Sequence, residues 1–333
     1  MKTIQSFTLL ALVPALLAGC DGAPEDRPRL GQNAHAIVNG EDAQPGEFPF
    51  MVSLKMKAVR MRGDEVLQES YQHLCGGTLI SPTQILTAAH CVRAVKNHDQ
   101  SEDLLSRSFP CGESGERCGV TYPAEGFVFV GEHALGEDEP GVEIRAYTAV
   151  DILIHPDFEW KNGKNDLAVI TLKEPSRKRP VALAGGEVYE FAEGRDSFLV
   201  MGWGRLRDRD EPQEGVNTLP TVLQKAWVPF VVRETCVEHY RRIKPRWVVG
   251  ESMICAGDYL PTVEKRRDAC DGDSGGPLLQ SIPHRPGEML QIGIASWGLG
   301  CAKNPGVYTT VGSYLGWAPL QSIAQTAPAT PAP

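Results

Sequence analysis

A serine lies in a glycine-rich stretch whose residue types suit covalent catalysis. The stretch runs from Asp268 to Pro277 and reads DACDGDSGGP, with the serine at Ser274. Its glycines allow a tight turn and let a carbonyl group come close to backbone amides. Taken alone, the same stretch, with Asp271 and Asp273, also fits an acidic turn or a calcium-binding loop. The serine therefore needs partners elsewhere in the chain before it indicates catalysis.

Two upstream motifs supply the groups that a serine nucleophile needs. His90 lies in the sequence TAAHC, and Asp166 lies in NDLA. A serine hydroxyl is a weak nucleophile unless a neighbouring base takes its proton, and histidine can do so because its pKa lies near neutrality. A carboxylate that accepts a hydrogen bond from the second ring nitrogen fixes the histidine tautomer. Together the three motifs indicate acyl transfer through a serine nucleophile.

In this chain order, the three motifs resemble those of the trypsin and chymotrypsin family of serine endopeptidases. The sequence IVNG from Ile37 resembles the processed N-terminus of that family, and SWG from Ser296 resembles its substrate-binding strand. The resemblance covers most of the chain, from about Ile37 to Trp317. It implies an enzyme that hydrolyses peptide bonds through an acyl-enzyme.

The resemblance also assigns roles within the site. His90, Asp166 and Ser274 are implied to form the catalytic triad. The backbone N–H groups of Gly272 and Ser274 are implied to bind the oxyanion of the tetrahedral intermediate. We expect no cofactor.

Substrate selection is implied to depend on Asp268, at the floor of the primary specificity pocket. A carboxylate there, between open walls at Gly298 and Gly306, selects a side chain that ends in a positive charge, Arg or Lys. Ala269 stands beside it where typical trypsins have Ser. A compact Lys ammonium loses a hydrogen bond there, so we expect Arg to be preferred over Lys. The residues implied to pair with the substrate backbone are Ser296, Trp297 and Gly298.

The IVNG motif also implies activation by cleavage before Ile37. In the family, the α-amino group freed there pairs with the Asp preceding the catalytic Ser, here Asp273, and orders the oxyanion turn. The pairing needs a charged amine, so it should weaken at high pH. The preceding residue is Ala36, where trypsin-like zymogens usually carry Arg or Lys. Because an enzyme specific for basic residues would not cut this bond, we expect a separate activating protease that prefers small residues.

The first 36 residues are expected to lie outside the fold. A basic start at Lys2, an apolar run and the sequence LAGC ending at Cys20 are typical of a secretory signal over residues 1–19. LAGC resembles the bacterial lipoprotein box, in which Cys20 carries a lipid anchor. The alternative is an ordinary signal peptide with a chance Cys. The segment 20–36 is typical of a disordered pro-segment, and we expect an exported protein, secreted or periplasmic or lipid-anchored.

The cysteine count agrees with export. The chain has nine Cys, and setting Cys20 aside leaves an even number that the sequence alone does not pair. Disulfides persist in oxidising compartments. The resemblance implies three pairs and leaves a fourth as a short local loop: Cys75–Cys91, Cys236–Cys255, Cys270–Cys301 and Cys111–Cys118.

Composition excludes several other classes of protein. The hydrophobic share of 42% is ordinary for a globular protein with a core. The net charge of −9 gives no indication of nucleic-acid binding, and the mixed-sign segment 205–211 is typical of a solvated loop. No second apolar run is long enough to span a membrane. We expect a monomer.

Short apolar runs punctuated by Gly and Pro indicate an all-β protein. The resemblance makes this two six-stranded antiparallel barrels with the active site between them, in a domain spanning 37–320. We expect a C-terminal helix over 313–324 and a disordered tail over 321–333. The strand-like runs are 50–54, 85–86, 127–130, 152–154, 167–172, 198–201, 227–232, 277–279, 292–294 and 307–310.

Two loops leave alternatives open. The segment from Cys91 to Phe127 is longer than is typical for the family, and it either overhangs the cleft and restricts substrates or is a solvated insertion. The acidic loop from Gly131 resembles the trypsin calcium loop, but its spacing is off by about two residues. We favour a solvated acidic loop and predict no metal. Its carboxylates are Glu132, Glu137, Asp138, Glu139 and Glu143.

Two other functions compete with an endopeptidase. A non-enzymatic binding relative of the fold would usually lack one of the triad residues, and here all three are present. An esterase could use the same acyl chemistry, but Asp268 argues against it because a pocket for basic residues is a feature of peptide hydrolysis.

Overall fold

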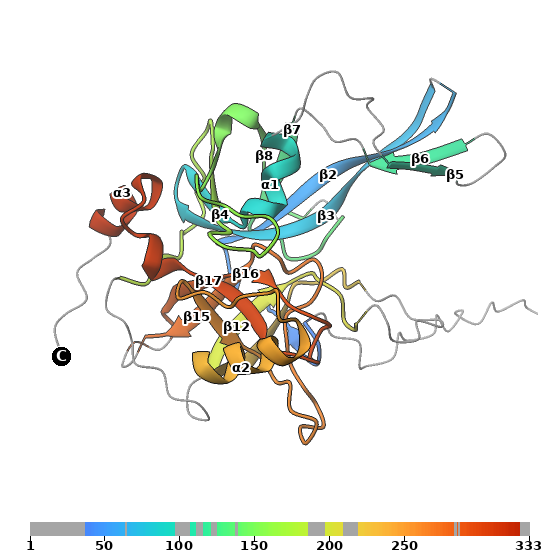
Figure 1. Ribbon diagram of the computed structural model, residues 1–333. Coiled ribbons are helices and arrows are strands. Elements are labelled where there is room, and N and C mark those ends of the chain that lie inside the picture. Colours follow the sequence, from blue (N-terminus) through green and yellow to red (C-terminus); the bar gives the residue numbers. More distant parts are fainter. Residues whose placement is uncertain are drawn as a thin grey trace, which may run out of the picture. The chain divides into compact units, whose positions relative to one another are not determined.

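The structure is a computed structural model that describes residues 37–63, 65–96, 107–110, 116–120, 125–136, 139–185, 197–208, 219–282, 285 and 287–326. Within these residues, the strands form two antiparallel barrels (Figure 1). This agrees with the all-β, two-barrel fold predicted from the sequence. The segment 1–36, with Cys20, lies outside the described residues. No helix among the residues described combines the length and apolarity needed to cross a membrane.

The first barrel is a ring of strands that closes on itself. The strands are β2 (Met51–Arg62), β3 (Glu65–Ser81), β4 (Gln84–Thr87), β10 (Ala168–Thr171), β9 (Ile152–Ile154), β8 (Glu143–Thr148) and β7 (Glu125–Val130). The turn η1 (Ala149–Asp151) joins β8 to β9, so these two pieces act as one barrel strand. Counted in this way, the barrel has six strands, each paired with the next in the order given above. The last strand, β7, also pairs with the first, β2, and this pairing closes the barrel.

The second barrel also closes with six strands. In order of pairing they are β12 (Ser197–Gly202), β13 (Gln224–Val231), β14 (Met253–Ala256), β17 (Gly306–Thr310), β16 (Met289–Trp297) and β15 (Pro277–Ser281). The barrel closes because β15 also pairs with β12. Two-residue strands add to its outside: β1 (Glu41–Asp42) pairs with β13, and β11 (Ala182–Leu183) pairs with β16.

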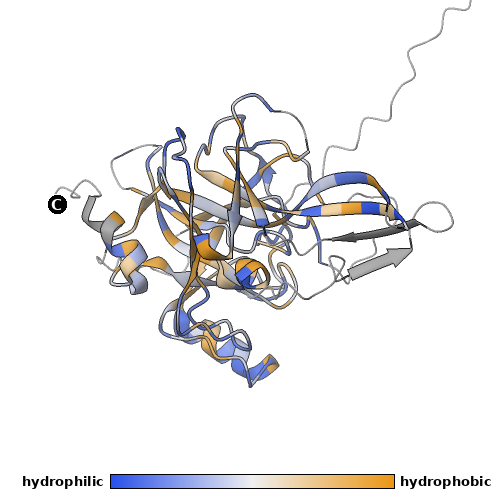
Figure 2. Cartoon of the chain, turned by 90° about the horizontal axis from the view of Figure 1, so that it is seen from above, coloured by the Kyte–Doolittle hydropathy of each residue, from blue (hydrophilic) through white to orange (hydrophobic). Residues whose placement is uncertain are grey.

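Apolar side chains fill both barrels and the space between them. Met51, Val52 and Leu54 of β2 are buried, as expected for a strand covered on both faces. One buried cluster joins residues of the first barrel to Met201 and Ile294 of the second. Figure 2 shows apolar residues (orange) along the strands. Burial of this surface holds the two barrels in a fixed relation.

A long hairpin extends the first barrel outward. Beyond residue 57, β2 and β3 continue as a two-stranded ribbon (Figure 1). The pair β5 (Arg107–Pro110) and β6 (Glu116–Val120) joins the outer part of β2, at Ala58–Arg62. The strands β5 and β6 of the long segment after Cys91 thus widen this ribbon, and residues 97–106, 111–115 and 121–124 of the segment lie outside the described residues.

The described helices are short and lie outside the barrels. They are α1 (Ala89–Lys96), α2 (Arg233–Ile243), the turn η2 (Val311–Tyr314) and α3 (Ala318–Thr326).

The C-terminal helix differs from its predicted bounds of 313–324. Ser313 belongs to η2, and α3 begins at Ala318 and continues to Thr326, inside the segment expected to be a disordered tail. The helix continues because its apolar side chains pack on the first barrel: Leu320 is fully buried, and Ile323 lies against the same cluster.

The described residues contain three disulfides, with the pairing that the resemblance implied. Cys75–Cys91 links β3 to α1, Cys236–Cys255 links α2 to β14, and Cys270–Cys301 links two loops of the second barrel. Cys111 lies outside the described residues, so its bond to Cys118 stays a prediction.

Candidate active site

The three candidate triad residues come from different elements of both barrels. His90 lies in the first turn of α1, directly after β4, and Asp166 precedes β10. Because β4 and β10 are neighbours, paired at Thr87 and Ala168, the two side chains start from adjacent strand ends. Ser274 lies in the turn before β15 of the second barrel. Its carbonyl accepts a 2.8 Å hydrogen bond from the N–H of Gly76 in β3, which fixes the turn against the first barrel.

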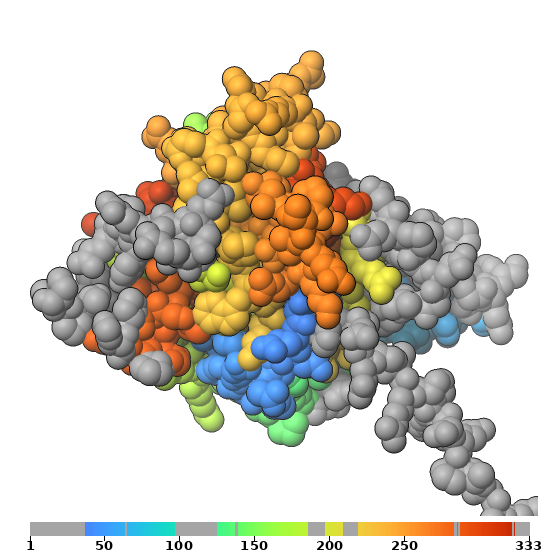
Figure 3. Space-filling model, turned by 90° about the horizontal axis from the view of Figure 1, so that it is seen from below, coloured from blue at the N-terminus to red at the C-terminus, as the bar shows by residue number. Residues whose placement is uncertain are grey.

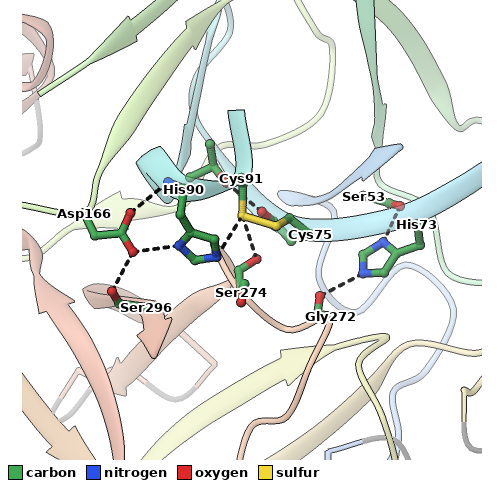
Figure 4. Close-up of a disulfide and its surroundings, with 11 residues drawn as sticks. Ser53, His73, Cys75, His90, Cys91, Asp166, Gly272, Ser274 and Ser296 are labelled. Atoms are coloured by element: carbon green, nitrogen blue, oxygen red, sulfur yellow. Dashed lines mark hydrogen bonds and ion pairs between the residues drawn. A yellow bond between two sulfur atoms is a disulfide. The ribbon is translucent and has the colours of Figure 1, made fainter. Parts of the chain in front are cut away.

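His90 and Asp166 form a close, partly buried pair (Figure 4). Nδ1 of His90 lies 2.7 Å from Oδ2 of Asp166, and the backbone N–H of His90 donates to Oδ1 at 2.9 Å. The hydroxyl of Ser296 donates to the same Oδ2 at 2.6 Å, and Thr309 donates to the backbone carbonyl of Asp166 at 3.1 Å. Asp166 is 1% exposed, so these donors replace water around its carboxylate. They also fix the orientation of the His90 ring.

Ser274 lies beside His90, and no hydrogen bond joins their side chains among the contacts that the structure describes (Figure 4). Nε2 of His90 instead lies 3.6 Å from Sγ of Cys91, and the same sulfur lies 3.6 Å from the carbonyl oxygen of Ser274. Hydrogen bonds at such sites are often long without substrate and tighten when it binds. The structure thus brings two of the three residues into direct contact and the third next to them.

The turn before Ser274 has the geometry of an anion site. Gly272 has φ +103°, and a Cβ there would lie 2.9 Å from Cα of Gly204, so only glycine fits. In the described part of the chain, the N–H groups of Gly272 and Ser274 donate no hydrogen bond. Two such donors at one turn can stabilise a developing oxyanion.

A second histidine, His73 of β3, supports this turn from behind (Figure 4). Its Nε2 lies 2.9 Å from the carbonyl oxygen of Gly272, and its Nδ1 lies 2.8 Å from Oγ of Ser53. Because a carbonyl only accepts, Nε2 carries the proton and Nδ1 accepts from Ser53. Burial lowers the pKa of His73 to about 4, so the ring is neutral at physiological pH. His73 was not among the site residues predicted from the sequence, and no local motif marks it.

Asp273 and Ile37, the two residues implied to take part in activation, are both buried. Asp273 is 2% exposed and accepts 2.8 Å hydrogen bonds from the N–H groups of Gly204 and Cys270. Burial raises its pKa to about 7. Ile37 is fully buried, and the next residue, Val38, donates to the carbonyl of Asp268 at 3.0 Å. Figure 3 shows this first described segment (blue) against the second barrel (orange).

A cavity of about 460 Å³ opens beside Ser274, with Asp268 at its wall. Asp268 is 3% exposed; its Oδ2 accepts from the N–H of Ala302 at 2.9 Å, and its Oδ1 has no hydrogen-bond partner among the described residues. Burial raises the pKa of this carboxyl well above its ordinary value. An unpartnered buried carboxylate is costly, so the cavity favours a cationic ligand.

The other residues predicted for this pocket line the same cavity. They are Ser296, Trp297, Gly298 and Gly306. A Cβ at Gly306 would lie 3.0 Å from Oδ1 of Asp268, whereas a Cβ at Gly298 would meet only Cα of Gly306 at 4.0 Å. The absence of side chains at both positions keeps the approach to the carboxylate open. Ser296 has a second contact beyond the predicted pairing with substrate, because its hydroxyl donates a hydrogen bond to the Asp166 carboxylate.

Three of the five carboxylates in the acidic loop form an ion pair or hydrogen bonds with other groups of the protein. Glu132 forms a buried ion pair with Lys55. Glu139 accepts hydrogen bonds from the N–H groups of His133 and Ala134, and Glu143 accepts one from Arg177. Glu137 and Asp138 lie outside the described residues. The described cluster with metal-ligand side chains, Cys75, His90 and Cys91, contains a disulfide, so its sulfurs are not free ligands.

Comparison with known proteins agrees with this geometry. The family model described as Trypsin matches residues 37–109 and 114–318. The chain belongs to the trypsin family. Among curated proteins, it is 31% identical to vitamin K-dependent protein C of Mus musculus, over 84% of this chain and 50% of that protein. It is 30% identical to the protein of the same name from Rattus norvegicus, over 88% of this chain and 53% of that protein. This member of the trypsin family thus spans about half the length of the curated relatives that it matches.

Proposed function

We propose that the protein is a serine endopeptidase that cleaves peptide bonds after Arg and, more slowly, after Lys. The observation that carries this proposal is the unpartnered Oδ1 of Asp268 in the cavity that Ser274 also lines. A substrate guanidinium or ammonium would neutralise this carboxylate. The substrate carbonyl would then lie beside the serine hydroxyl.

The proposed reaction proceeds through an acyl-enzyme. Oγ of Ser274 attacks the carbonyl carbon while Nε2 of His90 takes its proton, and Asp166 holds the resulting imidazolium. The N–H groups of Gly272 and Ser274 stabilise the oxyanion. The intermediate collapses as His90 returns the proton to the leaving amine. Water activated by His90 then hydrolyses the ester and restores the Ser274 hydroxyl.

The function is tested with a chromogenic peptide amide ending in Arg and the protein cleaved before Ile37. We expect hydrolysis that a serine-directed inhibitor blocks. A non-enzymatic binding relative would leave the amide intact. An esterase would hydrolyse the matching ester and leave the amide unchanged.

Ala269 is expected to make the enzyme favour Arg over Lys. Its methyl group offers no hydrogen bond to a compact ammonium, whereas a guanidinium can bond Asp268 in bidentate fashion. With matched peptide amides we expect kcat/KM for Arg to exceed that for Lys by roughly tenfold or more. The variant Ala269→Ser should lower the ratio of kcat/KM for Arg to kcat/KM for Lys. Equal turnover of the two substrates by the unaltered enzyme would contradict this expectation.

The proposed activation step is cleavage of the bond between Ala36 and Ile37. The new α-amino group would pair with Asp273, whose carboxylate has no cationic partner among the described residues. A protease that prefers small residues would act on this bond. N-terminal sequencing of the active enzyme should begin at Ile37, and any other start would contradict the proposal.

Asp273 is expected to give the uncleaved chain a distinctive pH dependence. Its folded pKa of about 7 lies above the ordinary carboxyl value. The folded state therefore binds the proton more tightly, and the free energy of unfolding falls as pH rises from about 4 to about 7. Between pH 5 and pH 8, the uncleaved Ser274→Ala protein should lose more thermal stability than the same protein carrying Asp273→Asn. Parallel Tm curves for the two proteins would contradict this.

We further propose that the protein acts outside the cytoplasm as a monomer on protein or peptide substrates. The three disulfides support an oxidising compartment. Secretion through the segment 1–19, a pro-segment at 20–36 and lipid attachment at Cys20 remain proposals from the sequence. The mass and N-terminus of the exported protein test all three.

A further inference from the structure

Four positively charged side chains lie in the last turn of α2 and in the segment that follows it. Residues 241–250 read RRIKPRWVVG, with Arg241, Arg242, Lys244 and Arg246 and no acidic residue. All four of these side chains are exposed. The whole chain has a net charge of −9, so this segment carries the opposite sign to the protein as a whole. Its local positive field attracts anionic partners.

Contacts within the fold do not account for all of these charges. Arg241 and Arg242 share one partner, Glu238, in exposed ion pairs, and their place at the end of α2 also suits the helix dipole. Lys244 and Arg246 lie beyond the helix. Within the described part of the chain, neither of these two side chains forms an ion pair or a hydrogen bond. Both are therefore available to an anion outside the protein.

Exposed apolar side chains alternate with the cations in the same segment. Val248 is 64% exposed and Ile243 is 44% exposed. In Figure 3 the part of the chain that holds α2 and this segment (gold, top) projects from the body of the molecule. A soluble anion needs only the cations, whereas a lipid bilayer also takes up apolar side chains below its headgroups. The mixture of the two kinds of side chain therefore favours a membrane as the partner.

The segment is held in a fixed conformation next to the candidate active site. The N–H of Lys244 donates to the carbonyl of Tyr240 at 2.8 Å, and the N–H of Trp247 donates to the carbonyl of Lys244 at 2.9 Å. The ring of Trp247 packs 5.0 Å from the ring of Trp297, which lines the cavity beside Ser274. A preformed surface loses little conformational entropy when it binds.

We propose that residues 241–248 form a docking surface for a membrane that contains anionic phospholipids. The cations lie against the phosphate groups of the lipids, and Ile243 and Val248 enter the layer below them. Because Trp247 contacts Trp297, docking holds the candidate active site close to the bilayer. The surface stays on the protein after cleavage before Ile37, whereas a lipid on Cys20 leaves with the segment 20–36. Docking itself does not depend on the proposed function.

The test measures, by flotation, how the protein cleaved before Ile37 binds vesicles. We expect it to bind vesicles that contain phosphatidylglycerol and not vesicles of phosphatidylcholine alone. The double variant Lys244→Gln with Arg246→Gln should lower the affinity about 25-fold, since each basic side chain at an anionic membrane contributes about fivefold. The matched control, Lys173→Gln with Arg179→Gln, removes one Lys and one Arg at exposed positions after β10 of the first barrel. It should change the affinity by no more than about twofold.

A third variant, Val248→Ser, separates a membrane from a soluble polyanion. It should weaken binding to the anionic vesicles several-fold and leave binding to heparin unchanged, because only the bilayer takes up the apolar side chain. Vesicle binding that survives the double variant would overturn the docking surface. Vesicle binding that Val248→Ser leaves unchanged would assign the cations to a soluble polyanion and also overturn the proposal. All variants should hydrolyse a soluble arginyl amide like the unaltered protein, which shows that they are folded. If no form of the protein hydrolyses the amide, the proposed function fails, while vesicle binding still tests docking.

Discussion

Replacing Ser274 with Ala is expected to lower kcat for an arginyl peptide amide by about 10⁴-fold or more, the scale on which serine hydrolases lose activity without their nucleophile. The alanine removes the atom that forms the acyl-enzyme, and water cannot use the same geometry. Because the turn is fixed by backbone bonds from Gly76 and to Ala295, the fold should not change.

The measurement pairs this variant with Ser281→Ala, which alters an exposed serine of the same barrel. Both proteins should unfold at the temperature of the unaltered protein, and only Ser274→Ala should lose activity. Substantial turnover by a Ser274→Ala preparation of verified mass would contradict the proposed chemistry.

Replacing Asp268 with Asn is expected to remove the selection for basic side chains. Binding sites that depend on one buried polar partner discriminate by about 10⁴–10⁵-fold, so kcat/KM for Arg amides should fall by a factor on the order of 10³ or more. The stability at neutral pH should rise, because burial raises the pKa of Asp268 and its ionised form is therefore unfavourable in the fold.

The matched control is Asp271→Asn, which removes the same charge at an exposed position of the same cavity. It should change the preference for Arg by only a few-fold, since exposed charges interact weakly. If Asp268→Asn retained the ratio of Arg to Phe substrates, the selection would have to come from another residue.

The parts of the site that could be predicted are those carried by short motifs. Ser274 and Gly272 share one turn, and His90 lies in a five-residue motif, so local sequence was sufficient to place them. Apolar runs with Gly and Pro between them predicted an all-β protein, and the resemblance to the trypsin and chymotrypsin family predicted that its strands form two barrels.

The supporting contacts could not be predicted because they join residues far apart in sequence. His73 and the Gly272 carbonyl are 199 residues apart, and Ser296 and Asp166 are 130 apart. No local pattern marks either pair. Their geometry depends on how the two barrels meet.

The ribbon was not predicted, and the C-terminal helix was predicted with other bounds, for different reasons. Residues 65–72 are almost all exposed, on both faces of the strand, so they lack the alternation that marks a half-buried strand, and only pairing with β2 makes them extended. The helix α3 extends to Thr326 because Leu320 finds a buried position on the first barrel. Tertiary contacts therefore determine the extended conformation of the ribbon and the end of the helix.

The most direct test of the central claim is covalent labelling of the protein cleaved before Ile37 with an arginyl phosphonate, with the adduct located by mass spectrometry. We expect one adduct, on Ser274, and much slower labelling by the matching phenylalanyl phosphonate. Labelling at another residue, no labelling, or equal rates with the two reagents would contradict an arginine-selective serine endopeptidase.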